Sequence, residues 1–162
     1  MPPPLVRARF ADVIDSLSRR LGTPRFEPHI TLSGGEAAEA NIRARTSALA
    51  ARLAPVPVHL TRAGYTDAYF RCLFVHAART PALLAARASA AIEYERPLDE
   101  EFMPHLSLVY GELASLQKEK ILDDLGREFD VHFVAEEITL CRADGTPDTW
   151  PLIGPFKLTG RH

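Results

Sequence analysis

Two short segments of the chain carry the residue types that acid–base chemistry needs. Residues 26–32 have the sequence FEPHITL and residues 102–108 have the sequence FMPHLSL, so Phe, Pro, His and the final Leu are identical. Each segment places a hydroxyl two residues after its histidine: Thr31 after His29, and Ser107 after His105. Because packing alone would not keep both groups in both copies, the repeat predicts two structural halves that share one site.

The spacing within each segment suits a phosphate ester. In a strand, residues i and i+2 point to the same face, so each histidine projects beside its hydroxyl. Hydrolysis of a cyclic phosphodiester needs one group to deprotonate the attacking water and a second group, on the opposite side of phosphorus, to protonate the leaving oxygen. Histidine can do either, since its pKa is near neutrality. The hydroxyls can donate to the non-bridging oxygens. This chemistry requires no metal, and the sequence offers no third ligand at zinc-like spacing. We expect no cofactor.

Apolar periodicity and turn residues predict the elements that position these segments. Pro81 begins one predicted helix, and the apolar run after Ala68 predicts a strand that is buried on both faces. The predicted helices span residues 5–21, 36–53, 81–94 and 114–128. The predicted strands span residues 28–33, 56–64, 68–76, 104–110, 131–141 and 150–158, with a turn at 143–148 between the last two.

The order of elements differs between the two halves in one respect. The second half begins with a strand before its helix and motif strand, whereas the first half begins directly with a helix. A strand that once preceded Met1 is therefore expected, and its absence predicts an exposed sheet edge near the N-terminus through which copies could associate. We predict one domain, residues 1–162, built from lobe-forming repeats at about 1–66 and 67–162.

Composition sets limits on the class of protein. The chain has 162 residues, of which 46% are hydrophobic and 25% charged, which is ordinary for a globular domain. No apolar run approaches a membrane span, and the start lacks the apolar stretch of a secretory signal, so we expect a cytoplasmic protein without a membrane partner. The two cysteines, Cys72 and Cys141, predict buried free thiols rather than a disulfide framework or a metal cluster.

Charge argues mildly against a polyanionic partner. The net charge is −2, and an acidic cluster precedes the second motif: Glu93, Glu95, Asp99, Glu100 and Glu101. A protein for long nucleic acid would need a basic footprint, which this chain lacks. We therefore expect a small nucleotide carrying a cyclic phosphate as the partner.

The two motif segments resemble those of a known superfamily. The segment 26–32 and the segment 102–111, FMPHLSLVYG, resemble the 2H phosphoesterases, and within them the cyclic phosphodiesterases of the plant and yeast type. The likeness extends to residues 69–74, 140–144 and 149–150. The His-x-Thr/Ser pair is highly specific for the superfamily, while the flanking Pro and Tyr110 point less firmly to the subfamily.

The resemblance implies a fold and an activity. It implies an α+β, two-lobed, pseudo-twofold (LigT-like) fold, in which antiparallel sheets line a central cleft and helices lie outside; the family's first strand is missing here. It also implies metal-independent hydrolysis of ADP-ribose 1″,2″-cyclic phosphate and of nucleoside 2′,3′-cyclic phosphates to 2′-phosphates. By position, the catalytic histidines are His29 and His105. The phosphate-binding residues are Thr31, Ser107 and Tyr110.

The sequence context also indicates where other aromatic and histidine residues lie. Tyr69 and Phe70 could stack on the substrate base, or could form a core pair on a buried strand. Trp150 is expected to anchor the core or the rim of the cleft first, and to contact a nucleotide second. His59 and His132 alternate out of phase with apolar neighbours, which predicts that both face solvent.

Two alternatives stay open from the sequence. The first is an RNA 2′,3′-cyclic phosphodiesterase that acts on tRNA or other RNA ends; it would share both motifs but should have a basic groove. The second is a nucleotide-binding module that keeps the cleft without turnover. The presence of both histidines disfavours this module, and the missing strand favours it.

Overall fold

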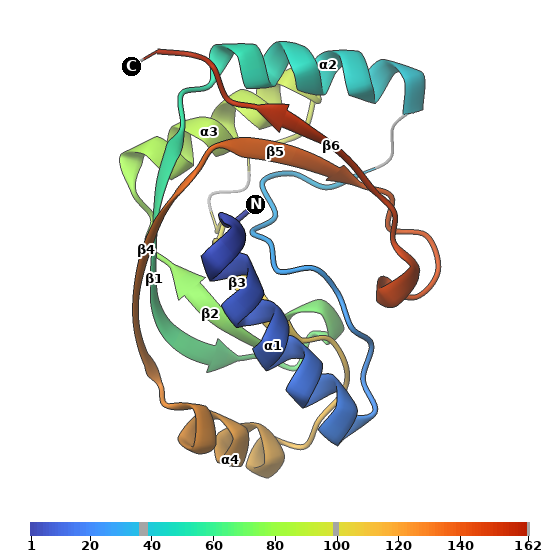
Figure 1. The fold of residues 1–162 in the computed structure, drawn as a ribbon, viewed down its shortest axis with the longest axis vertical. Helices are drawn as coiled ribbons and strands as arrows, with labels where there is room; N and C mark the ends of the chain where they lie inside the picture. Colours follow the sequence, from blue (N-terminus) through green and yellow to red (C-terminus); the bar gives the residue numbers. More distant parts are fainter. Residues whose placement is uncertain (36–38, 99–100, 162) are drawn as a thin grey trace.

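The computed structural model describes residues 1–35, 39–98 and 101–161 (Figure 1). The helices are α1 (Pro4–Leu21), α2 (Glu39–Arg52), α3 (Pro81–Glu93) and α4 (Ser115–Leu125), with two short 3₁₀ turns, η1 (Tyr69–Arg71) and η2 (Pro147–Thr149). The strands are β1 (Val56–Tyr65), β2 (Leu73–Ala77), β3 (His105–Val109), β4 (Glu128–Ala135), β5 (Glu137–Cys141) and β6 (Leu152–Lys157).

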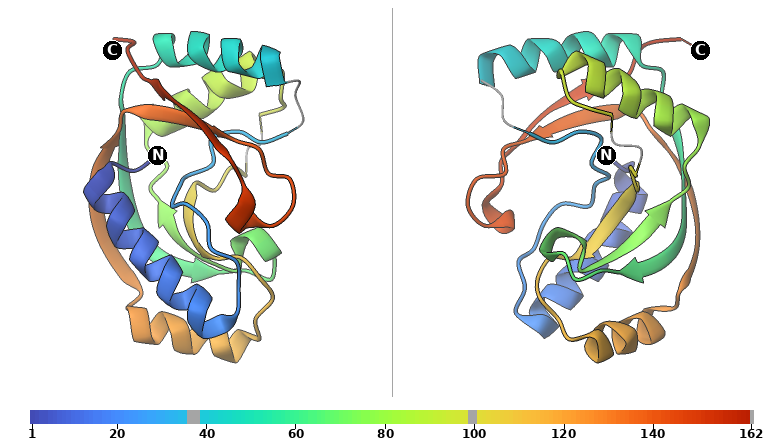
Figure 2. Two further views of the ribbon diagram at one scale, coloured as in Figure 1. Left: turned by 45° about the vertical axis from the view of Figure 1, so that its right-hand side comes forward. Right: turned by 180° about the vertical axis from the view of Figure 1, so that it is seen from behind.

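The strands form two antiparallel sheets. The first has four strands in the order β3-β2-β1-β4, and the second is the β5–β6 hairpin. In Figure 1, α1 crosses beside the four-stranded sheet, α2 and α3 lie together at one end with the β5–β6 hairpin, and α4 lies at the other end. Figure 2 shows the same α+β arrangement from two further sides, with the helices on the outside. The α+β prediction is confirmed.

One face of the four-stranded sheet builds the core. Val56, Val58 and Leu60 alternate inward along β1, as a strand with one buried face should. The helix α1 presents Phe10 and Leu17 to this same core, where they pack with the strand side chains. The helix ends at Gly22, whose φ of +67° is the left-handed conformation of a helix C-cap. The opposite face carries His105 and Ser107 together with the buried Phe74, which is paired with Ser107.

Three predicted strands differ from the structure. The predicted strand 28–33 contributes only an isolated bridge at Ile30, where Pro28 has no N–H to donate and Gly34 and Gly35 soon follow. The predicted strand 131–141 is two strands in different sheets. It breaks at Glu136, whose carbonyl instead accepts a hydrogen bond from the Leu158 amide.

The third difference concerns residues 68–76, which were predicted to be a strand buried on both faces. The first part of this segment forms η1, and only Leu73–Ala77 forms the strand β2. Thr66 stabilises the turn, because its hydroxyl accepts a hydrogen bond from the Ala68 amide at 3.2 Å and donates one to the Arg71 carbonyl at 2.8 Å. The turn brings Phe70 to the surface, with 54% of its area exposed.

The helix boundaries follow the prediction more closely. α1 and α3 begin and end within a residue of the expected limits, while α4 ends at Leu125 because Gly126 breaks it and β4 begins two residues later. The beginning of the predicted helix 36–53 falls on residues 36–38, which lie outside the described residues. Both cysteines are free, as predicted, but only Cys72 is buried; Cys141 is exposed at the end of β5, so the prediction of two buried thiols is wrong for Cys141.

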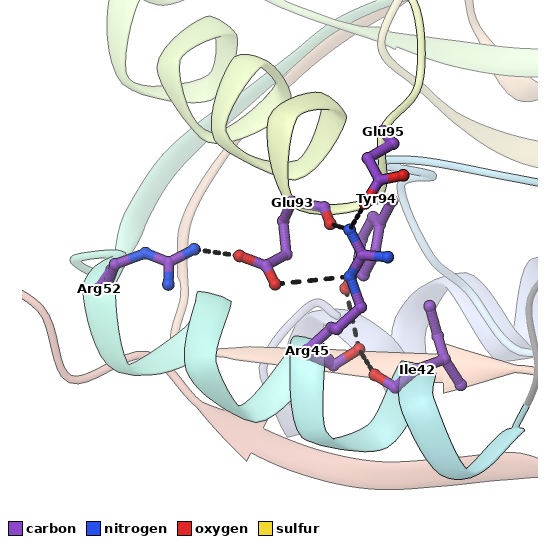
Figure 3. Close-up of polar contacts among 7 residues, drawn as sticks. Ile42, Arg45, Arg52, Glu93, Tyr94 and Glu95 are labelled. Atoms are coloured by element: carbon purple, nitrogen blue, oxygen red, sulfur yellow. Dashed lines mark hydrogen bonds and ion pairs between the residues drawn. The ribbon is translucent and has the colours of Figure 1, made fainter.

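Part of the predicted acidic cluster is paired with arginines of α2. Glu93 forms ion pairs with Arg45 and Arg52, and Glu95 pairs with Arg45 at 2.9 Å (Figure 3). These pairs connect α2 to the end of α3. Asp99 and Glu100 lie outside the described residues. Two of the three described residues of the cluster, Glu93 and Glu95, are therefore paired, so this part of the cluster presents less free negative charge than its sequence indicates.

In the part of the chain that the structure describes, no helix is both long enough and apolar enough to cross a lipid bilayer.

Candidate active site

The two motif segments lie side by side. Ile30 and Leu106 form an antiparallel bridge, which places residue 29 opposite 107 and residue 31 opposite 105. Each histidine is therefore opposite the hydroxyl of the other copy, and all four side chains project from the same face. Directly opposed Cβ atoms in such a pair are about 5 Å apart and diagonal ones about 7–8 Å. The diagonal pair is His29 and His105, a separation that leaves room for a phosphate between the two rings.

Both imidazoles are oriented in the same way. Nδ1 of His29 donates to the Glu27 carbonyl at 2.7 Å, and Nδ1 of His105 donates to the Met103 carbonyl at 2.8 Å. A carbonyl oxygen can only accept, so each bond fixes the proton on Nδ1 and leaves Nε2 as the titrating nitrogen. Each neutral ring thus presents a lone pair, and each charged ring an acidic proton.

Both histidines prefer the neutral form. Burial lowers the pKa of His29. The hydrogen bond to the Glu27 carbonyl raises this pKa, and the positive charges of the N-terminal ammonium and of His105 lower it further. Burial also lowers the pKa of His105, and the positive charge of Arg71 lowers it further. The Glu27 carboxylate acts in the opposite direction on His29, since it raises the pKa. The two rings are alike in geometry but differ in their charged neighbours.

The two hydroxyls differ in burial. Ser107 is 5% exposed and its Oγ donates to the Phe70 carbonyl at 3.2 Å, whereas Thr31 is exposed. The Tyr110 side chain is also buried, and burial raises the pKa of its hydroxyl to about 12, although Ser107 opposes this shift. Tyr110 therefore remains protonated at neutral pH and can donate a hydrogen bond beside Ser107.

These residues line a cleft of about 1900 Å³ that extends to the β5–β6 hairpin. The cleft contains all five of the predicted catalytic and phosphate-binding residues: His29, Thr31, His105, Ser107 and Tyr110. Its volume exceeds that of an ordinary small-molecule pocket, roughly 300–1,000 Å³. Volume alone therefore does not select among small nucleotides and larger substrates.

An aromatic cluster borders the phosphate-facing residues. The Tyr110 ring stacks on Phe26 at 3.8 Å between centroids, and Phe70 meets Tyr110 edge to face at 5.2 Å. Trp150 lies 6.0 Å from Phe70 and lines the cleft. Of the two residues predicted to stack on a base, Phe70 lines the cleft, while Tyr69 packs against Phe70 from outside it.

Sequence reasoning missed Arg71 as a site residue. Its side chain lines the cleft and acts electrostatically on His105, although 34 positions separate the two residues in the chain. The family resemblance could have indicated Arg71, because this residue belongs to the resembling segment 69–74. The prediction of a buried strand over 68–76 placed its side chain in the core instead. The turn η1 instead carries Arg71 and Phe70 together to the edge of the cleft.

Comparison with known proteins identifies the family of the chain. The family model described as the 2′-5′ RNA ligase superfamily matches residues 2–147. The chain belongs to this superfamily. It is thereby a 2H phosphoesterase, and the match includes both motif segments. The resemblance drawn from the sequence is confirmed.

Two relatives extend over nearly the whole chain. A protein of Arabidopsis thaliana named cyclic phosphodiesterase is 25% identical over 162 aligned residues, which cover 93% of this chain and 87% of the relative. The crystal structure of TT0787 of Thermus thermophilus superposes with a TM-score of 0.66 at 22% identity, covering 99% of this chain and 95% of that one. The latter likeness confirms the predicted superfamily fold.

Proposed function

We propose that this member of the superfamily hydrolyses cyclic phosphodiesters of small nucleotides without a catalytic metal. The candidate substrates are nucleoside 2′,3′-cyclic phosphates, opened to 2′-phosphates, and ADP-ribose 1″,2″-cyclic phosphate, opened to the 1″-phosphate. The observation that carries the proposal is the crossed pairing of the motifs, in which two imidazoles with free Nε2 atoms flank a space edged by two hydroxyls.

We assign His105 as the base and His29 as the acid. Arg71 disfavours a charged His105, as a base requires. At His29 the Glu27 carboxylate favours the charged form but the N-terminal ammonium opposes it more strongly, so the charged form depends on the bound phosphate. Nε2 of His105 takes a proton from water as its oxygen bonds to phosphorus. Nε2–H of His29 gives a proton to the leaving sugar oxygen as the phosphorus–oxygen bond breaks. The bound phosphate, being negative, raises the pKa of His29 and so supplies the charged form.

The remaining polar groups hold the phosphate. The hydroxyls of Thr31 and Ser107 donate to the non-bridging oxygens, where negative charge accumulates in the transition state. Tyr110 adds a third donor from the same side as Ser107. Phe70 at the edge of the cleft offers its ring to the base of the nucleotide.

Hydrolysis of 2′,3′-cyclic AMP and of ADP-ribose cyclic phosphate, measured with EDTA present, tests the proposal. His29→Gln and His105→Gln should each lower kcat by roughly 10²–10⁴-fold. The matched control is His132→Gln on β4, whose side chain does not line the cleft, and this variant should keep the activity of the parent. No turnover by the parent protein, or turnover that EDTA abolishes, would refute the proposal.

The assignment of acid and base has a separate test. A phosphodiester with a p-nitrophenolate leaving group needs little protonation as it departs, so it does not depend on the general acid. His29→Gln should lose far less activity on this substrate than on the cyclic nucleotide, whereas His105→Gln should lose activity on both. The reverse pattern would exchange the two roles without affecting the proposed reaction.

The alternative substrate, a cyclic phosphate at an RNA end, gains support from one observation. The acidity that argued against a polyanion is partly neutralised, because Glu93 and Glu95 are paired with Arg45 and Arg52. Opening of a cyclic-ended oligoribonucleotide, with both small substrates inert, would favour this alternative. Binding of the nucleotides without turnover would favour the non-catalytic module.

A further inference from the structure

A second group of histidines lies outside the cleft, on β1 and β4, the two strands farthest from β3 in the four-stranded sheet. His59 on β1 and His132 on β4 are directly opposite each other in the antiparallel register. Asp130 precedes His132 by two residues and so projects from the same face. The cluster of these three residues is on the solvent side, with side-chain exposures of 33% for His59 and 67% for His132. The sequence prediction that both histidines face solvent is confirmed, but their pairing was not foreseen.

The three side chains converge on one point. Nε2 of His59 lies 2.9 Å from Oδ1 of Asp130, and Nε2 of His132 lies 3.0 Å from the same oxygen. The two imidazole rings stack at 3.8 Å between centroids with 14° between their planes. One ligand atom from each residue lies within 4.8 Å of the other two. Two parallel imidazoles directed at one carboxylate are a donor set for a cation of the zinc type.

The ligand atoms are already close together, but the rings must turn to hold such a cation, because a metal lies in the plane of each imidazole that binds it and the two rings are now stacked nearly parallel. In a tetrahedral zinc site with ligand bonds of about 2.0–2.1 Å, neighbouring ligand atoms are about 3.3 Å apart. The two nitrogen–oxygen distances of 2.9 and 3.0 Å would therefore open by only a few tenths of an ångström. The two strands fix the Cβ positions through their backbone pairing, so the ligands are positioned in advance.

We propose that His59, Asp130 and His132 form a binding site for a divalent first-row transition-metal cation, for which Zn²⁺ is the probe. Three protein ligands leave the fourth position of the tetrahedron to solvent, at an exposed edge of the sheet. The cation would join β4 to β1 through side chains as well as backbone. Because β3 carries His105 at the other edge of the four-stranded sheet, this site is separate from the candidate active site.

Calorimetric titration of the protein with ZnCl₂ tests the site. The exposed thiol of Cys141 could bind zinc by itself, so Cys141→Ser is the background for every variant. We expect one Zn²⁺ per chain in this background. His59→Gln and His132→Gln should each weaken binding by roughly tenfold or more, since even loss of an outer-shell partner of a metal site costs 10–100-fold.

The catalytic histidines provide the matched controls. His29→Gln and His105→Gln remove imidazoles from the cleft and should leave zinc affinity unchanged. Thermal unfolding gives a second measure, because a ligand that binds only the folded protein raises Tm. Zn²⁺ should raise the Tm of the background protein and have little effect on the His59 and His132 variants, which should melt like the background protein in EDTA.

Three results would overturn the proposal. The first is that the background protein shows no saturable zinc binding. The second is that the His59 and His132 variants bind zinc as well as the background protein does. The third is that the His29 or His105 variants lose zinc binding instead. The first would make the cluster a hydrogen-bonded surface group, and the third would place the zinc in the cleft. Substitution of Co²⁺ supplies an independent readout, since its visible absorption reports coordination by the histidines directly.

Discussion

The difference in burial between the two motif hydroxyls predicts unequal contributions to catalysis. Ser107 is 5% exposed and acts where water is largely excluded, whereas Thr31 is exposed on a segment held to the sheet by one bridge. A hydrogen bond to a charged group contributes about 1.5–3 kcal/mol. At an exposed site water screens the charge and competes for the bond, which brings the contribution toward the roughly 0.5–1.5 kcal/mol of an ordinary hydrogen bond. We expect Ser107→Ala to be in the upper range and Thr31→Ala in the lower range.

These energies convert directly into rates. At about 1.36 kcal/mol per tenfold, a loss of 2–3 kcal/mol lowers kcat/KM by roughly 30- to 160-fold for Ser107→Ala, and a loss of 0.5–1.5 kcal/mol lowers it by roughly 2- to 13-fold for Thr31→Ala. The assay is steady-state hydrolysis of 2′,3′-cyclic AMP. Thr31→Ser, which keeps the hydroxyl, is the control and should retain most of the activity.

The folded state must be checked separately, because the Ser107 hydroxyl also donates to the Phe70 carbonyl. Loss of this bond should cost about 0.5–1.5 kcal/mol of unfolding free energy, visible as a lower urea midpoint. An equal loss of kcat/KM in Ser107→Ala and Thr31→Ala, or a larger one in Thr31→Ala, would refute the argument from burial.

Three further predictions follow from the site. Because burial lowers the pKa values of both proposed catalytic histidines below about 6.5, kcat/KM should be maximal on the acid side of neutrality. Arg71→Gln should raise the pKa of His105 and so move the acid limb of this profile to higher pH; a limb that stays or moves down contradicts this. Phe70→Ala should raise KM for 2′,3′-cyclic AMP by roughly 5- to 150-fold, the equivalent of 1–3 kcal/mol of stacking, without raising it for glycerol 1,2-cyclic phosphate, which has no base. The unfolding free energy should fall as pH drops from about 6.5 through the lower folded-state pKa values of His29, His76 and His105, because over this range the unfolded chain binds protons that the folded chain does not. Urea midpoints measured across this range should fall less steeply in the His29→Gln/His105→Gln double variant than in the parent.

The sequence was most informative where the chain repeats itself. The two histidine–hydroxyl pairs are recognisable from local spacing alone, because a strand periodicity of two determines which side chains project together. Whether the two copies meet is a question of long-range pairing, and the single bridge between Ile30 and Leu106 answers it. The repeat itself predicted a shared site, and the register now gives the crossed arrangement of His29 and His105, which no local pattern specifies.

The misassigned elements have a common physical cause. Apolar residues at 68–76 favour a buried strand. The Thr66 hydroxyl, however, hydrogen-bonds the Ala68 amide and the Arg71 carbonyl, and these bonds stabilise the turn η1. Similarly, the alternation over 131–141 does not reveal that the chain leaves one sheet for another at Glu136. The consequences are functional, since the first of these errors concealed the position of Arg71.

The crossed pairing of the motifs gives the candidate site a near-twofold rotational degeneracy. A cyclic phosphate turned by half a revolution would meet another imidazole, another hydroxyl and the same distances, so the duplicated groups by themselves do not decide which of its two ester bonds is cleaved. That regiochemistry must come from whatever breaks the symmetry: Arg71 beside one ring, Glu27 beside the other, and the aromatic side chains that fix the direction of the nucleoside. Under the proposed function, the repeated residues would supply the reactivity, and the residues that are not repeated would determine the product.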